Sequence, residues 1–149
     1  MENNMSITFD ADSRNESLAR IMAAAFVTEL DPTLEEINDI KTAVSEAVTN
    51  CIVHGYKDCI STVYINAKIF ENGKVVIKIR DKGCGIEDIE KSMEPMYTTA
   101  GEERAGLGFA VMQSFMDKVK VSSKLGKGTT VTMEKSIIRR IGTHVERNA

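Results

Sequence analysis

Hydrophobic residues recur every three or four positions in two neighbouring stretches of the N-terminal half, the spacing of one face of an α-helix. The first stretch runs from Asn15 to Leu30. The second begins after Thr33, which stands three residues before Glu36 in the spacing of a capping box, and runs to about His54. The pattern therefore predicts two consecutive amphipathic helices.

Elsewhere, apolar and polar residues alternate in five short stretches, which predicts β-strands with one buried face. Asn72-Gly73 lies between the second and third stretches and is a strong signal for a two-residue hairpin. Gly126 to Gly128 supplies a turn between the last two stretches. These strands are expected at residues 6–9, 63–69, 75–79, 119–123 and 129–135.

The remaining segments complete the expected fold. We expect a third helix from Phe109 to Met116, a short helix from Glu87 to Met93, and a long mobile loop from Glu94 to Gly106. Residues 139–149 lack periodicity and predict a disordered tail, which leaves one domain over residues 1–138. The expected fold class is α+β: a two-layer sandwich of a mostly antiparallel mixed sheet with helices on one face.

Composition limits the classes of protein to which the chain can belong. Its 149 residues suffice for one domain with its own core. A net charge of −3 argues against a nucleic acid as the main partner. No apolar run approaches about 18 residues and the N-terminus does not resemble a signal peptide, so we expect a cytoplasmic protein without membrane association. The cysteines Cys51, Cys59 and Cys84 fit neither a disulfide framework nor a zinc site.

A carboxylate and an amide lie four residues apart on the second predicted helix. Glu46 and Asn50 fall on the side opposite the apolar stripe, so the two side chains share one polar face. An amide oxygen can ligate Mg²⁺ without adding charge, and a carboxylate can accept a proton from a nucleophile. Taken alone, such a pair is far more often a solvated helix face.

A glycine-rich segment, Asp81-Lys82-Gly83-Cys84-Gly85, directly follows a predicted strand. A carboxylate at a strand end can accept a hydrogen bond from an adenine amino group, and the glycines allow a ligand to approach the backbone closely. The segment lacks the GxGxxG spacing and the βαβ context of a dinucleotide-binding fold, and the chain contains no Walker A loop. By itself the segment is more often a tight turn.

Two further glycine motifs follow. Gly106-Leu107-Gly108 is expected at the entrance to the third helix, where free backbone amides can bind phosphate oxygens. Gly128-Thr129-Thr130 opens the last strand and is also good hairpin chemistry. Each motif alone is equally typical of a connector or a turn, so the order of all four along the chain is the more specific observation.

In this order and spacing, the four motifs resemble those of the GHKL (Bergerat) ATPases, which include histidine-kinase ATP domains, Hsp90, gyrase B and MutL. Several segments resemble more narrowly the SpoIIAB family of bacterial anti-sigma F factors. The resemblance covers about Met5 to Ile137, and every motif position is kept. The segments that carry the narrower likeness are residues 15–20 with 24–26, 45–50, 52–56 and 106–109.

The resemblance implies a role for each motif position. Glu46 would be the general base that deprotonates a serine hydroxyl, and Asn50 would ligate Mg²⁺. Asp81 would read the adenine of ATP or ADP, and Arg20 would face protein partners. The remaining expected nucleotide-binding positions are Gly83 and Gly85 beside the adenine, Thr130 through a water molecule, Thr98, Thr99 and Arg104 in a covering lid, and Gly106, Leu107 and Gly108 at the phosphates.

By the same resemblance, the chain would be an ATP- and Mg²⁺-dependent serine-protein kinase and anti-sigma factor that acts as a homodimer. It would inhibit sporulation sigma factor F and phosphorylate a serine of an anti-anti-sigma antagonist of the SpoIIAA kind, with no direct nucleic-acid or membrane partner. Two alternatives stay open: a nucleotide-gated module that binds the sigma factor without transferring phosphate, and a stand-alone histidine-kinase-type ATP domain. The chain's only histidines, His54 and His144, disfavour the second alternative.

Overall fold

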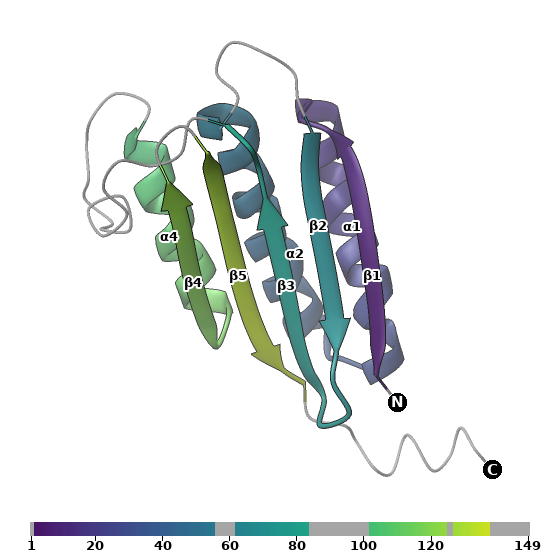
Figure 1. Ribbon diagram of the computed structural model, residues 1–149. Helices are drawn as coiled ribbons and strands as arrows, with labels where there is room; N and C mark the ends of the chain where they lie inside the picture. Colours follow the sequence, from purple (N-terminus) through teal and green to yellow (C-terminus); the bar gives the residue numbers. More distant parts are fainter. Residues whose placement is uncertain (1, 56–61, 84–101, 125–126, 138–149) are drawn as a thin grey trace, which may run out of the picture.

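The computed structural model describes residues 2–55, 62–83, 102–124 and 127–137. Within these residues, five strands form one sheet in the order β1-β2-β3-β5-β4, and the three helices lie on one side of it (Figure 1). This two-layer arrangement confirms the expected α+β class. The strands are β1 (Asn3–Asp10), β2 (Thr62–Ile69), β3 (Lys74–Arg80), β4 (Lys118–Lys124) and β5 (Gly128–Ser136), and the helices are α1 (Glu16–Val27), α2 (Leu34–Asn50) and α4 (Glu102–Phe115).

Every strand pair in the described part of the chain is antiparallel, including β1 with β2. A mostly antiparallel mixed sheet was expected, and all the pairings among the described strands are antiparallel. The reason is the pair of helices between β1 and β2. Helix α1 carries the chain along the sheet in one direction and α2 carries it back, so β2 starts at the end of the sheet where β1 finished (Figure 1).

The hairpin predicted at Asn72-Gly73 joins β2 to β3. Gly73 has a φ of 85°, a left-handed conformation that favours glycine. The turn is closed by the amide of Phe70, which donates to the carbonyl of Lys74 at 2.9 Å, and by the amide of Gly73, which donates to the carbonyl of Phe70 at 3.0 Å. These bonds fix the register that pairs Ile69 with Val75.

The start of α2 confirms the capping box. The Thr33 hydroxyl accepts the Glu36 amide at 3.0 Å, while the Glu36 carboxylate accepts the Thr33 amide at 2.8 Å. Two amides at the helix N-terminus are thereby paired. The α-helix ends at Asn50, and the chain continues as a π-helical turn over Cys51–Gly55. Helical structure therefore extends to the expected end near His54, but its last turn is a π-helix.

The core lies between the sheet and the helices. Alternate residues of β2, β3 and β5 are buried, as the period of two predicts, and they face the buried stripe of α2. Apart from Val76, the side chains on the opposite faces of these strands are polar or charged. The largest fully buried side chains include Leu30, Ile40, Ile69, Ile77, Ile79, Phe109, Met112 and Met133.

The third helix is longer than predicted. Helix α4 begins at Glu102, so the expected long loop does not extend to Gly106. Gly106 and Gly108 lower helix propensity and made this stretch look like a connector, but packing of α4 against α2 overrides that preference. The short helix expected at 87–93, the rest of the expected loop and the tail lie outside the described residues.

Candidate nucleotide-binding site

Glu46 and Asn50 lie one turn apart near the C-terminal end of α2. Glu46 is half-buried, whereas Asn50 is buried with 8% of its surface exposed. Neither side-chain nitrogen nor oxygen of Asn50 has a hydrogen-bond partner among the described residues. A buried amide without partners costs about 1–3 kcal/mol of stability. This orphaned amide therefore indicates a position that a ligand completes.

Gly108 brings the backbone of α4 against both side chains. A Cβ added to Gly108 would lie 3.1 Å from Glu46 Oε2 and 3.1 Å from the amide nitrogen of Asn50. Only glycine allows this approach without displacing one of the two polar groups. The expected pair of α2 and the last glycine of the Gly106-Leu107-Gly108 motif therefore meet in space.

Asp81 directly follows β3 and is buried, with 4% of its surface exposed. Burial raises the pKa of its carboxyl, while hydrogen bonds from the amides of Gly83 and Thr129 and from the Cys51 thiol act in the opposite direction. The Gly83 amide donates to Asp81 Oδ1 at 2.8 Å. A carboxylate held in this way by three donors has a fixed orientation, as a hydrogen-bond acceptor for a base requires.

Cys51 links this carboxylate to the end of α2. The thiol is buried next to Asn50 in the sequence, and it is a free cysteine. Its pKa is raised well above the usual value, first by burial and then by the negative charge of Asp81. The thiol therefore stays protonated and can donate to Asp81. Sequence reasoning assigned Cys51 no role, because its contact with Asp81 bridges thirty positions of the chain.

Gly128 supports Asp81 from β5. Its φ of 99° favours glycine, and an added Cβ would collide with the Asp81 carbonyl and lie 2.7 Å from the Cα of Lys82. The next residue, Thr129, accepts the Asp81 amide with its carbonyl at 3.0 Å. The Thr129 hydroxyl lies 2.7 Å from that of Ser123. The Gly-Thr-Thr motif thus builds one wall beside the carboxylate.

The structure places Thr130 differently from the expectation. Thr130 pairs with Arg80, which is exposed on the face of the sheet away from the helices, whereas Thr129 is buried on the same side as Asp81. Because strand side chains alternate between faces, Thr130 points away from Asp81. Thr129, which sequence reasoning did not select, is the threonine at the site. The alternation of buried Val131 and Met133 could have identified it.

Gly106 and Gly108 lie inside α4 and not at its start. Only the first four amides of a helix lack intrahelical partners, and in α4 these precede Gly106. The free amides at the start of α4 therefore lie nearer to Glu102 than to Gly106, where a phosphate-binding helix entrance was expected. Leu107 is 49% exposed. Arg104 belongs to α4, while Gly85, Thr98 and Thr99 lie outside the described residues.

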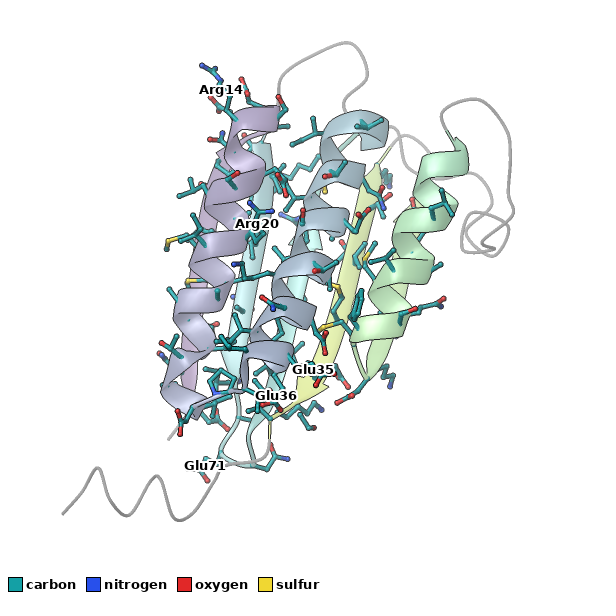
Figure 2. The ribbon with its side chains drawn as sticks, turned by 180° about the vertical axis from the view of Figure 1, so that it is seen from behind. Arg14, Arg20, Glu35, Glu36 and Glu71 are labelled. Atoms are coloured by element: carbon teal, nitrogen blue, oxygen red, sulfur yellow. The ribbon has the colours of Figure 1, made fainter. Side chains whose placement is uncertain are left out.

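Arg20 lies on α1, beside α2 in the helix layer (Figure 2). Its guanidinium is 3.7 Å from Glu16 Oε1, and the same carboxylate oxygen accepts the hydroxyl of Ser45 on α2. Arg20 is thus connected through Glu16 to the residue that precedes Glu46. The structure does not bring Arg20 into the group formed by Asp81, Asn50 and Glu46.

The residues that meet here fit a nucleotide and a magnesium ion. Asp81 offers an oriented acceptor, and the orphaned amide of Asn50 offers a neutral oxygen ligand. Mg²⁺ keeps several waters and needs only one or two protein ligands when phosphates supply the others. The described part of the chain contains no group of three or more histidine, cysteine or acidic residues able to hold a metal by itself.

Comparisons with known proteins decide the family. Residues 9–135 match the model of the histidine kinase-like ATPase domain. An anti-sigma F factor of Thermoanaerobacter sp. strain X514 is 58% identical over 136 residues, which are 91% of this chain and 94% of that protein. The anti-sigma F factor of Clostridium acetobutylicum is 54% identical over the same shares of the two chains. This chain belongs to the anti-sigma F factor family.

A solved structure supports the fold of this anti-sigma F family member. The RsbU and RsbW domains of Rv1364c from Mycobacterium tuberculosis align with a TM-score of 0.68 at 21% identity, over 91% of this chain and 32% of that one. At this identity the likeness shows the fold alone. Within the described residues, no helix is both long enough and apolar enough to cross a membrane. Family and fold together establish a histidine kinase-like ATPase domain.

Proposed function

We propose that this chain is an ATP- and Mg²⁺-dependent serine-protein kinase that also binds and inhibits sigma factor F. Its protein substrate is an anti-anti-sigma factor of the SpoIIAA kind, and it works as a homodimer in the cytoplasm. Membership of the anti-sigma F factor family supports the partners, and the histidine kinase-like ATPase domain supports the use of ATP.

The observation that carries the proposal is the meeting of Glu46, Asn50 and Gly108. A half-buried carboxylate lies beside an orphaned amide, and a glycine leaves space against both. A carboxylate can accept a proton, and the neighbouring amide oxygen can hold a cation that binds phosphates. A domain that only sensed a nucleotide would require the amide and the adenine acceptor but not the carboxylate.

The transfer step would proceed as follows. The serine hydroxyl oxygen of the partner attacks the γ-phosphorus of ATP in line with the bond to the β–γ bridging oxygen. The new oxygen–phosphorus bond forms as the bridging bond breaks, the serine proton passes to Glu46, and ADP leaves with the bridging oxygen. Asp81 holds the adenine and so positions the γ-phosphate.

Magnesium would neutralise charge on the phosphates, with Asn50 as its ligand from this chain. The lid positions Thr98, Thr99 and Arg104, together with Gly85, remain proposed nucleotide contacts. Arg20, exposed in part on the helix layer and held by Glu16, remains the proposed contact with protein partners. Thr129 replaces Thr130 in this scheme because Thr129 shares a face with Asp81.

The first experiment measures thermal unfolding of the pure protein with Mg-ATP, Mg-ADP, Mg-GTP or no nucleotide. An adenine nucleotide at about 100 times its dissociation constant should add about 2.7 kcal/mol of stability. For a domain of this size, that gain corresponds to a Tm increase on the order of 5–10 °C. A magnesium-dependent, adenine-selective shift supports the site, whereas no shift at millimolar nucleotide contradicts the whole proposal.

The second experiment separates a kinase from its two alternatives. Labelled ATP is incubated with the protein and either an anti-anti-sigma protein or a histidine-containing phosphotransfer domain, and acid-stable and acid-labile label are counted. Acid-stable label on serine supports the proposal. Nucleotide-dependent sigma binding without any transfer would identify a gated binding module, and acid-labile label on histidine would identify a histidine-kinase-type domain.

A further inference from the structure

The sheet face opposite the helices is strongly basic. Figure 1 looks onto this face, and no described helix covers it. The described strands contribute only two acidic side chains to it, Asp10 and Glu134, although the whole chain has a net charge of −3. We call it the basic face, and its basic residues on β2, β3 and β4 are Lys68, Lys74, Lys78, Arg80, Lys118, Lys120 and Lys124.

A hollow of about 270 Å³ lies on this face over β1, β2 and β3. Its polar lining combines hydroxyl, amide and cationic groups, and none of its lining residues is acidic. Because two of these groups are cations and the hydroxyls can donate, the lining is suited to an anion rather than to a cation. The polar lining residues are Ser6, Thr8, Tyr64, Asn66, Lys78 and Arg80.

Two cations of the hollow have no carboxylate partner within the part of the chain that the structure describes. The ion pairs found on this face among the described residues are Lys68 with Glu2 at 3.6 Å and Lys74 with Glu134 at 3.5 Å. Lys78 and Arg80 form no ion pair within the described residues, and both are exposed. Their charges are therefore available to a ligand.

Contacts between the side chains that line the hollow hold some of them in place. The Arg80 guanidinium lies 4.8 Å from the centre of the Tyr64 ring, which holds the cation over an aromatic face. The Asn66 amide donates to the Ser6 hydroxyl oxygen at 2.9 Å. That bond leaves the Ser6 hydroxyl hydrogen able to donate outward. An incoming anion would thus meet groups that are already oriented.

We propose that the basic face docks an acidic segment of a protein partner, with one carboxylate in the hollow between Lys78 and Arg80. A carboxylate matches the hydroxyl and cationic donors there. The face gathers seven basic side chains against two acidic ones, so an acidic segment complements its charge. A long nucleic acid would extend past the face and meet the rest of a chain whose net charge is negative.

The docking surface and the nucleotide site lie on opposite sides of the sheet. Asp81 is buried on the helix side, while its neighbour Arg80 is exposed on the other side. A partner can therefore be held on the basic face without covering Glu46 or Asn50. This inference does not depend on phosphoryl transfer, so it survives if the kinase proposal fails.

The test measures fluorescence anisotropy of a fluorescein-labelled octaglutamate peptide titrated with the full chain at low and physiological salt. We expect saturable binding that Lys78→Glu and Arg80→Glu each weaken at least tenfold. Lys41→Glu on α2 makes the same charge change in the helix layer and serves as the matched control. All variants must keep the wild-type Tm and the wild-type Tm shift with Mg-ATP, which shows that they are folded.

Each other outcome overturns the proposal. Equal losses of octaglutamate affinity in Lys41→Glu and Arg80→Glu would show a general effect of net charge. Unchanged affinity in both Lys78→Glu and Arg80→Glu would exclude the hollow as the binding site. Tighter binding of a labelled oligothymidine than of octaglutamate would identify a nucleic-acid surface. A change in oligomeric state of the hollow variants in sedimentation velocity would identify a contact between copies of this chain.

Discussion

Gly108 of α4 lies so close to Asn50 of α2 that a Cβ on the glycine would come within 3.1 Å of the Asn50 amide nitrogen. The same Cβ would be 3.1 Å from Glu46 Oε2. A single backbone position on one helix thus limits the space around two polar groups on another. The placement of α4 therefore controls access to the proposed base and the proposed magnesium ligand at once.

Gly108→Ala should lower the phosphotransfer rate while leaving the stability of the fold nearly unchanged. Alanine gains about 0.5–1 kcal/mol of helix propensity over glycine, which offsets part of the crowding against flexible side-chain ends. We expect a Tm close to that of the wild type but a phosphotransfer rate at least about tenfold lower, because Glu46 and Asn50 must move. Gln113→Ala, exposed on the same helix, is the control; equal rates in both variants would contradict the role of the close approach.

Glu46→Gln should greatly slow phosphotransfer and leave the binding of Mg-ATP intact. The substitution keeps the shape of the side chain but removes the proton acceptor, so the phosphotransfer rate should fall at least about 100-fold. The Tm shift with Mg-ATP should remain nearly that of the wild type. Glu35→Gln, exposed in the first turn of α2, removes the same charge and should leave the rate unchanged. A full rate in Glu46→Gln would exclude Glu46 as the base.

Asp81→Asn should weaken adenine nucleotides selectively. The carboxylate is an oriented acceptor, and a hydrogen bond to a charged group contributes about 1.5–3 kcal/mol, which corresponds to at least a tenfold loss of affinity. GTP, which lacks the adenine amino group, should lose little. Dissociation constants for ATP, ADP and GTP from isothermal titration calorimetry would decide, and equal losses for all three would rule out base reading by Asp81.

The same variant should alter the pH dependence of stability in the nucleotide-free protein. Burial raises the pKa of Asp81 above its ordinary value of 3.8, so the folded state binds the proton more tightly than the unfolded state. The contribution of Asp81 to the free energy of unfolding therefore decreases as the pH rises from about 3.8 through the pKa of the folded state. This destabilisation persists at neutral pH. An asparagine side chain does not ionise, so the Tm of Asp81→Asn minus that of wild type should be more positive at pH 7.5 than at pH 4.5. A difference independent of pH would show that burial does not penalise this carboxylate.

Local chemistry made much of the fold predictable. The Asn72-Gly73 turn and the Thr33–Glu36 capping box act over a few residues, and both are formed as expected. Glu46 and Asn50 could be placed on one face because helical periodicity holds over one turn. The beginning of α4 could not be placed, because its glycines disfavour a helix and the packing that compensates comes from α2.

The parts of the site that depend on tertiary contact could not be predicted from the sequence. Cys51 belongs to an apolar stripe, and only the fold brings its thiol to the Asp81 carboxylate. Thr129 is a different case, since the alternation along β5 already assigns it to the buried face and Thr130 to the other. The family motif supplied the pair of threonines, and strand geometry decides which of them faces Asp81.

Gly128 and Gly73 offer a matched pair of backbone tests. Both have positive φ, at 99° and 85°, and in both an added Cβ would collide with a backbone carbonyl, that of Asp81 or of Ile137. Gly128→Ala and Gly73→Ala should each therefore destabilise the protein by about 2–4 kcal/mol, measured by chemical denaturation. Only Gly128 touches the Asp81 segment, so Gly128→Ala should also weaken ATP binding at least about tenfold, whereas Gly73→Ala at the far hairpin should retain wild-type affinity in calorimetry below its Tm. If both variants lost affinity equally, the loss would reflect general destabilisation, and the wall that Gly128 forms beside Asp81 would have no specific part in nucleotide binding.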